Sequence, residues 1–315
     1  MRLKTLLVRE VIRRTAKKRL RLAPDVFSLR AELDRLKEGK PTRVYKERID
    51  TELLGGVRVE KVMPAFSNRK ASTPSVILYL HGGAWVVGAP EEFRSITTRL
   101  ATMTGTTVYA PSYRLAPEHP FPAGLDDCET VYDALCQQGI PSSRIVLAGD
   151  SAGGNLVFAL ALRLKCKQKP LPAALIGLSP CTDLTASGRS FKRNRWRDAL
   201  LPAERLNDCI TAYCPGDDLH SPAISPLFGD LSKLPPVLLQ VSNNEILLDD
   251  SVRMAKKIEA SGGQVNLEIW KGLWHVWQVM PDKVPEAQRA IEGIARFIRS
   301  VLGTDSPEEG RASKK

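Results

Sequence analysis

The sequence predicts an α/β fold with a mostly parallel central sheet, flanking helices and a helical cap. Short apolar runs that suit buried strands alternate with segments rich in helix-forming residues, which is typical of a parallel sheet. One apolar run leads directly into Gly-Asp-Ser-Ala-Gly at 149–153, a sharp strand-to-helix turn. Residues 183–225 are charged and irregular, and an insertion of that kind after a strand lies over the carboxyl edge of the sheet.

The expected elements follow in order along the chain. Residues 56–62 alternate between apolar and polar side chains, as in a half-exposed strand, whereas the later strands are mostly apolar and therefore buried. The later strands are expected at 75–80, 106–110, 144–148, 173–180, 236–241 and 265–270. Helices are expected within 1–50, at 123–138, directly after the serine turn, near 203–213, at 247–261 and at 284–302.

This pattern divides the chain into three parts. Residues 1–50 form a charged helical segment, and residues 51–302 form the main α/β domain, which contains the insertion 183–225. The polar tail 303–315 is expected to be disordered.

The net charge of +11 is concentrated at one end of the chain. Residues 1–50 hold 16 Lys and Arg against 7 Asp and Glu, so the remaining residues carry only +2. Leu3, Leu7 and Val11 begin an apolar stripe that Arg14 and Lys18 interrupt. We therefore favour a partly packed helix with a solvated basic face over a membrane-surface helix, and we expect neither nucleic-acid binding nor stable membrane insertion. Association of the basic segment with a membrane or a nucleic acid is the alternative.

Composition limits the compartment and the cofactors. The start of the chain has no uninterrupted apolar core and no run is long enough to span a bilayer, so a cytoplasmic protein is expected. The six cysteines lack C-x-x-C spacing and paired histidines, so we expect reduced thiols and no metal site.

Ser151 is the candidate nucleophile, because it is the central residue of the G-x-S-x-G turn. Gly149 and Gly153 permit the sharp turn, and the start of the following helix brings unpaired backbone N–H groups near the serine. The alternative is a glycine-rich turn that contains an ordinary serine.

A second glycine turn, HGGAW at 81–85, follows the strand 75–80. Attack by a serine on an acyl carbonyl creates an oxyanion that needs hydrogen-bond donors. We assign that oxyanion hole to the backbone N–H groups of Gly82, Gly83 and Ala152.

A serine nucleophile needs a base, and the base needs an acid to orient it. Of the four histidines, His275 is the candidate because it follows the last strand, at the edge of the sheet where Ser151 also lies. The acid should follow the strand 236–241, where Glu245 is preferred over Asp249 and Asp250 of the next helix.

Taken together, these motifs resemble the bacterial carboxylesterases of the hormone-sensitive-lipase-like family of α/β-hydrolases. The resemblance spans about residues 56–300 and rests on HGGAW at 81–85, YRLAPEHPFPA at 113–123, GDSAGG at 149–154, SPCTDL at 179–184, SNNEILLDD at 242–250 and LWHVW at 273–277. The family pattern HGGG is HGGA here, the acid is Glu245 where the family usually has Asp, and Ser242 stands where a glycine is frequent.

The resemblance implies an α/β-hydrolase fold in which residues 1–50 and the insertion together form the cap. It implies hydrolysis of short- to medium-chain acyl esters without a cofactor, and it allows a homodimer. Trp85 and Trp277, with Trp274, flank the motifs and are candidate walls of the substrate pocket, or alternatively core residues. A lactonase with the same triad, and a non-catalytic small-molecule receptor like the gibberellin receptor, are the rival functions.

Overall fold

A computed structural model describes residues 3–35, 45–65 and 74–304 of the chain. Within them, one sheet of eight strands has the order β1-β2-β4-β3-β5-β6-β7-β8. The strands are β1 (Arg48–Leu54), β2 (Val57–Met63), β3 (Val76–Leu80), β4 (Thr107–Pro111), β5 (Ile145–Asp150), β6 (Ala174–Leu178), β7 (Val237–Ser242) and β8 (Val265–Trp270). The pairs β1–β2 and β2–β4 are antiparallel, and every other pair is parallel. The predicted α/β class with a mostly parallel sheet is therefore confirmed.

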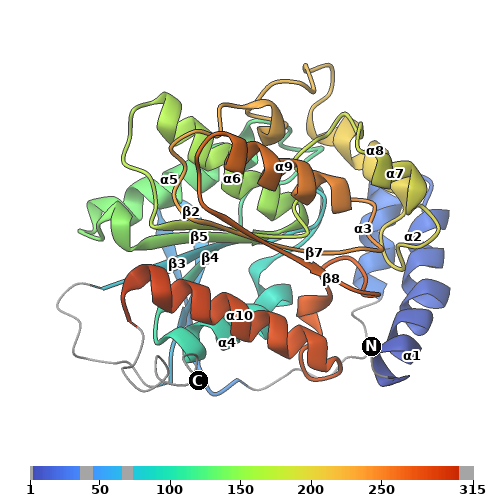
Figure 1. Ribbon diagram of the computed structural model, residues 1–315, viewed down its shortest axis with the longest axis horizontal. Coiled ribbons are helices and arrows are strands. Elements are labelled where there is room, and N and C mark those ends of the chain that lie inside the picture. Colours follow the sequence, from blue (N-terminus) through green and yellow to red (C-terminus); the bar gives the residue numbers. More distant parts are fainter. Residues whose placement is uncertain (1–2, 36–44, 66–73, 305–315) are drawn as a thin grey trace.

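Helices cover both faces of this sheet (Figure 1). The α-helices are α1 (Leu3–Ile12), α2 (Lys18–Leu22), α3 (Val26–Arg35), α4 (Arg94–Thr104), α5 (Ala123–Gln137), α6 (Ser151–Cys166), α7 (Arg189–Arg193), α8 (Ala203–Tyr213), α9 (Leu248–Ala260) and α10 (Pro285–Leu302). A π-helical turn, Arg13–Lys17, joins α1 to α2. Short 3-10 turns occupy Pro90–Phe93, Ser142–Arg144, Pro226–Phe228 and Trp277–Val279.

The period of two along the buried strands divides the core into two layers. In β3, Val76, Leu78 and Leu80 face the layer of α5, α6 and α9, whereas Ile77 and Tyr79 face the layer of α4 and α10. All five residues are at most 2% exposed, which explains why this strand reads as a continuous apolar run.

One strand, β1, and one helix of more than ten residues, α4, were not predicted from the sequence, and neither was the short helix α7. Strand β1 begins at Arg48, ahead of the boundary expected at residue 51, and its alternating charged side chains suit a half-exposed edge strand. Helix α4 contains four threonines, which are weak helix formers, and it forms because Ile96, Leu100 and Ala101 pack against the sheet.

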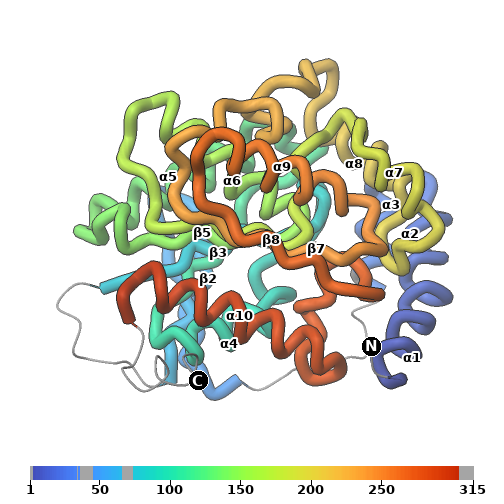
Figure 2. Tube along the Cα trace, in the orientation of Figure 1, coloured from blue at the N-terminus to red at the C-terminus, as the bar shows by residue number. Residues whose placement is uncertain are grey.

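The N-terminal helices lie against the insertion. Helices α2 and α3 both contact α8 (Figure 2, blue against yellow). The division into an N-terminal cap segment 1–50, a main domain 51–302 and a tail stays a prediction. Within the tail 303–315, residues 305–315 lie outside the described residues.

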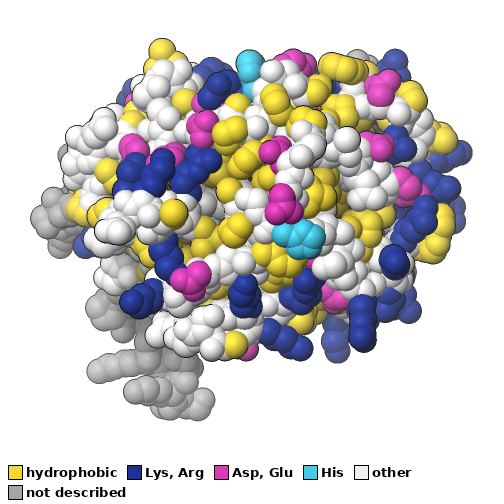
Figure 3. Space-filling view, turned by 90° about the horizontal axis from the view of Figure 1, so that it is seen from above, with side chains coloured by type: hydrophobic (Ala, Val, Ile, Leu, Met, Phe, Trp, Pro, Cys, Tyr) yellow, Lys and Arg dark blue, Asp and Glu magenta, His cyan; other side chains and the backbone are white. Residues whose placement is uncertain are grey.

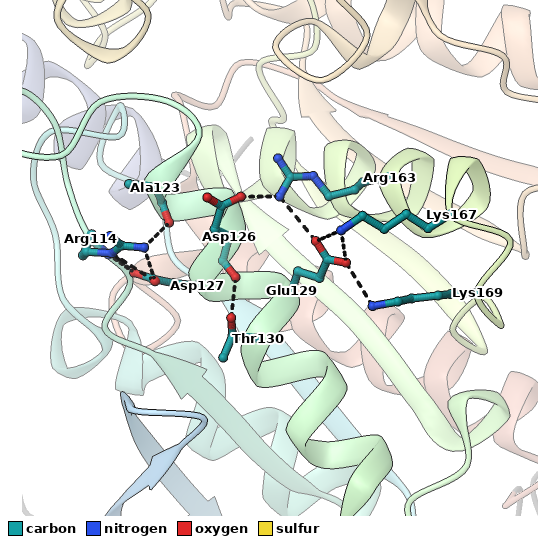
Figure 4. Close-up of polar contacts among 9 residues, drawn as sticks. All are labelled: Arg114, Ala123, Asp126, Asp127, Glu129, Thr130, Arg163, Lys167 and Lys169. Carbon is teal, nitrogen blue, oxygen red and sulfur yellow. Dashed lines mark hydrogen bonds and ion pairs between the residues drawn. The ribbon is translucent and has the colours of Figure 1, made fainter.

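A charged network fixes α5 against α6, the helix that starts at the serine turn (Figure 4). Glu129 of α5, largely buried, accepts hydrogen bonds from Lys167 at 2.6 Å and Lys169 at 3.0 Å. Arg163 of α6 reaches Asp126 at 2.5 Å. Because several charges share one partner, the network holds the helix pair more firmly than isolated surface pairs would.

Candidate active site

Ser151 lies at the junction of β5 and α6, as the motif predicts. Its φ of 52° is left-handed, which is uncommon and strained for a residue other than glycine. The turn packs directly against the end of β3: a Cβ atom on Gly153 would lie 2.0 Å from the carbonyl oxygen of Leu80 and 2.4 Å from that of His81. Only glycine fits there, so the close packing of this turn holds the serine in its strained conformation.

The structure brings Ser151, His275 and Glu245 together from the ends of three different strands. His275 Nε2 lies 2.8 Å from Ser151 Oγ, and His275 Nδ1 lies 2.8 Å from Glu245 Oε2. Glu245 is fully buried, and its other oxygen accepts hydrogen bonds from Ser179 Oγ at 2.9 Å and the Ser242 amide at 2.6 Å. These contacts fix the carboxylate in the plane needed to orient the imidazole.

The rejected acids have other partners. Asp250 accepts hydrogen bonds from the amides of Thr182 and Asp183, and Asp249 accepts one from the amide of Ser190. Both carboxylates therefore join α9 to the insertion, and neither contacts His275.

The electrostatic surroundings favour the charged form of His275. Burial by itself lowers the pKa of His275, but the hydrogen bond and negative charge of Glu245, with two further buried carboxylates, outweigh burial and raise the pKa above its ordinary value. The imidazolium that forms when a base takes a proton from serine is thereby stabilised.

The predicted oxyanion hole needs a correction at Gly82. The Gly82 amide donates a hydrogen bond of 3.0 Å to Asp150 Oδ1, so it is not available to a substrate. The Tyr79 hydroxyl donates to the same oxygen at 2.8 Å. A Cβ atom on Gly82 would lie 2.1 Å from Asp150 Oδ2, which explains why this position requires glycine. The motif alone does not reveal this contact, because it depends on the direction of the Asp150 side chain.

The next two residues of the loop are the remaining candidates for that role. Gly83 has φ 119° and Ala84 has φ 52°, and both line the cavity beside Ser151. In the described part of the chain, neither amide has a hydrogen-bond partner. Ala152 follows Ser151 in the first turn of α6, where backbone amides lack helical partners.

A cavity of about 370 Å³ opens onto Ser151. Its walls are mainly apolar and come from the glycine loop, the N-terminal helices, the insertion and the His275 loop. Among the lining residues are Leu20, Leu29, Leu33, Val87, Phe93, Leu200, Leu201, Leu206 and Val279. Arg205 and Glu92 are charged members of the wall.

Trp85 and Trp277 do not line this cavity, so their prediction as pocket walls is wrong. Trp85 is 1% exposed and stacks on Tyr213 with ring centroids 4.7 Å apart. Trp277 is fully buried in a separate apolar cluster with Trp274. Both are therefore core residues.

Three side chains of the insertion hold the loop that carries Glu245. Ser190 Oγ donates to the Ile246 carbonyl at 2.7 Å, and Asn194 Nδ2 donates to the Glu245 carbonyl at 2.8 Å. The Ile246 amide donates to Asp198 Oδ2 at 3.1 Å. In the sequence, these three residues are recognisable only by their spacing of four positions. That spacing is too common to predict the contacts.

The N-terminal helices hold the insertion in turn. Lys17 is buried, and its Nζ donates to the carbonyl oxygens of Arg195 at 2.8 Å and Asp198 at 2.5 Å. Burial lowers the pKa of Lys17. The ammonium therefore satisfies two backbone carbonyls that would otherwise lack donors.

Two other basic residues of the N-terminal segment contact loops of the site. Arg9 donates to the carbonyl of Gly272, in the loop before His275, at 3.0 Å. Arg30 donates to the carbonyl of Val86, in the glycine loop, at 2.6 Å. Part of the basic charge of residues 1–50 is thus used inside the molecule.

In the described ranges, no group of three or more His, Cys, Asp or Glu side chains is arranged to hold a metal ion. No helix among the same residues has the length and apolar character needed to cross a membrane.

Comparison with known proteins identifies the family of the chain. A protein-family profile described as "alpha/beta hydrolase fold" matches residues 77–279. An esterase of Acinetobacter venetianus is 39% identical over 90% of this chain and 91% of its own length. An acetyl-hydrolase of Streptomyces hygroscopicus is 37% identical over 81% of this chain and 83% of its own. The crystal structure of an esterase from the bacterial hormone-sensitive lipase family superposes with a TM-score of 0.87 and 34% identity, covering 96% of this chain and 99% of that one. The chain therefore belongs to the bacterial hormone-sensitive-lipase-like family of α/β-hydrolases and is a carboxylic ester hydrolase.

Proposed function

We propose that the chain hydrolyses short- to medium-chain acyl esters with Ser151 as nucleophile, His275 as general base and Glu245 as the orienting acid. The observation that carries this proposal is the pair of 2.8 Å contacts that place the His275 imidazole between the other two side chains. The order Ser–acid–His along the chain is the one that this architecture uses.

The reaction proceeds in two halves. His275 Nε2 takes the proton of Ser151 as Oγ attacks the ester carbonyl, and the resulting oxyanion is held by the amides of Gly83, Ala84 and Ala152. His275 then protonates the leaving alcohol. In the second half, water gives a proton to His275 and attacks the acyl carbonyl. His275 then returns that proton to Ser151 Oγ as the bond between Oγ and the acyl carbon breaks, which releases the acid and restores the serine.

The size of the cavity supports the expected chain length. Its volume of about 370 Å³ is at the small end of the roughly 300–1,000 Å³ typical of ligand pockets. Leucine side chains from the N-terminal helices and the insertion line it. The name of the Streptomyces relative, acetyl-hydrolase, also favours a short acyl group.

The test is hydrolysis of p-nitrophenyl esters from acetate to palmitate by the wild type and by Ser151→Ala, with a fluorophosphonate label that reports a reactive serine. Ser261→Ala, a change at an exposed helix end, is the matched control. We expect the hydrolysis rate of the wild type to peak at short or medium acyl chains. Both hydrolysis and labelling should be lost in Ser151→Ala and kept in Ser261→Ala. Retained turnover in a folded Ser151→Ala protein contradicts the proposal, and a preference for lactones over linear esters changes the substrate class.

A further inference from the structure

Exposed apolar side chains gather on one side of the molecule. Within the described residues, nine large hydrophobic side chains are exposed, and seven of them lie in the N-terminal helices or in the stretch 189–197 of the insertion. These seven are Leu3, Leu6, Leu7, Val11, Leu22, Phe27 and Trp196. The other two, Leu53 and Ile269, lie on the two edge strands of the sheet. We call the exposed side chains of residues 3–35 and 189–197 the docking face.

Helix α1 shows the division most clearly. Its inner side carries Thr5, which is buried and donates a hydrogen bond to Glu286 at 2.8 Å. Leu3, Leu7 and Val11, spaced four residues apart, lie on the outer side and are 60–74% exposed. The outer side of this helix is therefore apolar, not only basic as the sequence predicts. Exposure of an apolar stripe to water is unfavourable, and its transfer to an apolar phase lowers the free energy.

The excess basic charge of the chain lies in the same two stretches, although Arg9, Lys17 and Arg30 point inward to backbone carbonyls. Residues 3–35 and 189–197 hold 15 Lys and Arg against 4 Asp and Glu, a net charge of +11, which equals that of the whole chain. The rest of the chain is therefore neutral overall. Seven of these basic residues are exposed and form no ion pair with any described residue: Lys4, Lys18, Arg19, Arg189, Lys192, Arg193 and Arg197.

The two stretches form one continuous surface. Lys17 donates to the Arg195 carbonyl at 2.8 Å, and the Arg21 guanidinium lies 5.1 Å from the centre of the exposed Trp196 ring. Figure 1 places α1, α2 and α7 along one side of the fold. At the same side of Figure 3, dark-blue Lys and Arg side chains gather with hydrophobic ones between them.

We propose that the docking face binds reversibly to an anionic lipid surface. Exposed leucine, valine and aromatic side chains enter the boundary between head groups and acyl chains, and the surrounding cations are attracted to anionic head groups. The phosphates of a nucleic acid would attract the Lys and Arg side chains, but they would leave the aliphatic stripe exposed to water. A second copy of the chain would cover the stripe, but the two positively charged faces would repel each other. A lipid surface satisfies both features, and this inference does not depend on the proposed substrate.

The test is co-sedimentation of the full chain with vesicles of phosphatidylcholine alone or mixed with phosphatidylglycerol, at two salt concentrations. We expect binding only to the anionic vesicles, weakened by salt. In one variant, Lys18→Gln, Lys192→Gln and Arg193→Gln are combined, and the partition coefficient should fall by on the order of a hundredfold. The matched control combines Lys256→Gln, Lys283→Gln and Arg296→Gln, three exposed basic residues outside the face, and should fall much less.

A second variant separates lipid from other polyanions. Leu3→Ser, Leu7→Ser and Val11→Ser together keep every charge, and we expect them to weaken vesicle binding at least tenfold while hydrolysis of a soluble ester stays unchanged, because these residues do not line the cavity. Leu53→Ser on β1 is the control. Equal binding to neutral and anionic vesicles, equal losses in the controls, or binding to transfer RNA without binding to vesicles each overturns the proposal.

Discussion

Asp150, the residue before Ser151, accepts a hydrogen bond of 3.0 Å from the amide of Gly82 in the opposite loop. This bond joins the end of β5 to the glycine loop after β3, and so it sets the distance between Ser151 and the amides of Gly83 and Ala84. Asp150 is 2% exposed, and burial raises its pKa to about 7. The bond is stronger when the carboxylate is charged, so its strength changes near neutral pH.

Asp150→Asn is expected to simplify the pH dependence of activity. In the wild type, two groups gain protons as the pH falls through neutrality: Asp150, with its pKa of about 7, and His275, with a pKa above its ordinary value. Both changes reduce kcat/KM, so its logarithm should fall with a slope near two below both pKa values. The asparagine variant keeps an acceptor oxygen but cannot titrate, so the slope should approach one. An unchanged slope contradicts a role for the Asp150 charge.

Glu245→Gln is expected to lower kcat by roughly 10²–10⁴-fold and to move the acidic limb of kcat/KM to lower pH. The reason is that the negative charge of Glu245 raises the pKa of His275, and a neutral amide removes that charge. Glu245→Asp, which keeps the charge on a shorter side chain, is the matched variant and should retain more activity. Full activity of Glu245→Gln would contradict Glu245 as the acid that orients His275. Asp198 would then be the next candidate.

Asp198→Asn tests whether the insertion positions the catalytic loop. Asp198 is fully buried, accepts a hydrogen bond from the Ile246 amide at 3.1 Å, and contributes to the raised pKa of His275. We expect kcat to fall about tenfold with little change in KM. This fall is smaller than the ~10²-fold loss that a displacement of about 1 Å causes. The acidic limb should also move to lower pH.

The matched control for that prediction is Asp249→Asn, which also joins the insertion to α9 through the Ser190 amide at 2.9 Å but is not among the charges that raise the pKa of His275. Its pH profile should match that of the wild type. Equal shifts in both variants would reduce Asp198 to a structural role.

Gly153→Ala and Gly293→Ala form a pair of helical substitutions with opposite expected effects. A Cβ atom at 153 would lie 2.0 Å from the carbonyl oxygen of Leu80, so the free energy of unfolding should fall by about 3 kcal/mol or more. At 293 in α10 the nearest atom is 3.7 Å away, and alanine should stabilise the protein by roughly 0.5–1 kcal/mol. Urea unfolding midpoints measure both, and a neutral Gly153→Ala would show that the turn has room to move.

The sequence predicts the sheet well because its buried strands carry apolar side chains on both faces. It predicts which loops meet at the site because parallel strands end at the same edge. The three residues chosen from motif and order alone, Ser151, His275 and Glu245, therefore lie in contact in the structure. Strand β1 is missed because its charged side chains belong to an exposed edge, and α4 is missed because tertiary packing overrides the weak helix propensity of its threonines.

What the sequence does not predict depends on where side chains point. The Gly82 amide donates its hydrogen bond to Asp150, and the Trp85 ring packs in the core against Tyr213. Both facts require the three-dimensional path of the loop. The cavity walls come from helices near the N-terminus and from the insertion, which no local pattern brings together.

The hydrogen bonds of Lys17 also constrain the order in which the molecule assembles. Their acceptors, the carbonyls of Arg195 and Asp198, lie 178 and 181 residues further along the chain. At about 5–20 residues per second, a ribosome needs roughly 10–40 s to make that stretch. During this interval the first helices have neither the carbonyls that receive the ammonium nor the leucines that complete the cavity wall. The N-terminal helices therefore leave the ribosome well before the insertion, but they reach their final place only after the insertion has been made.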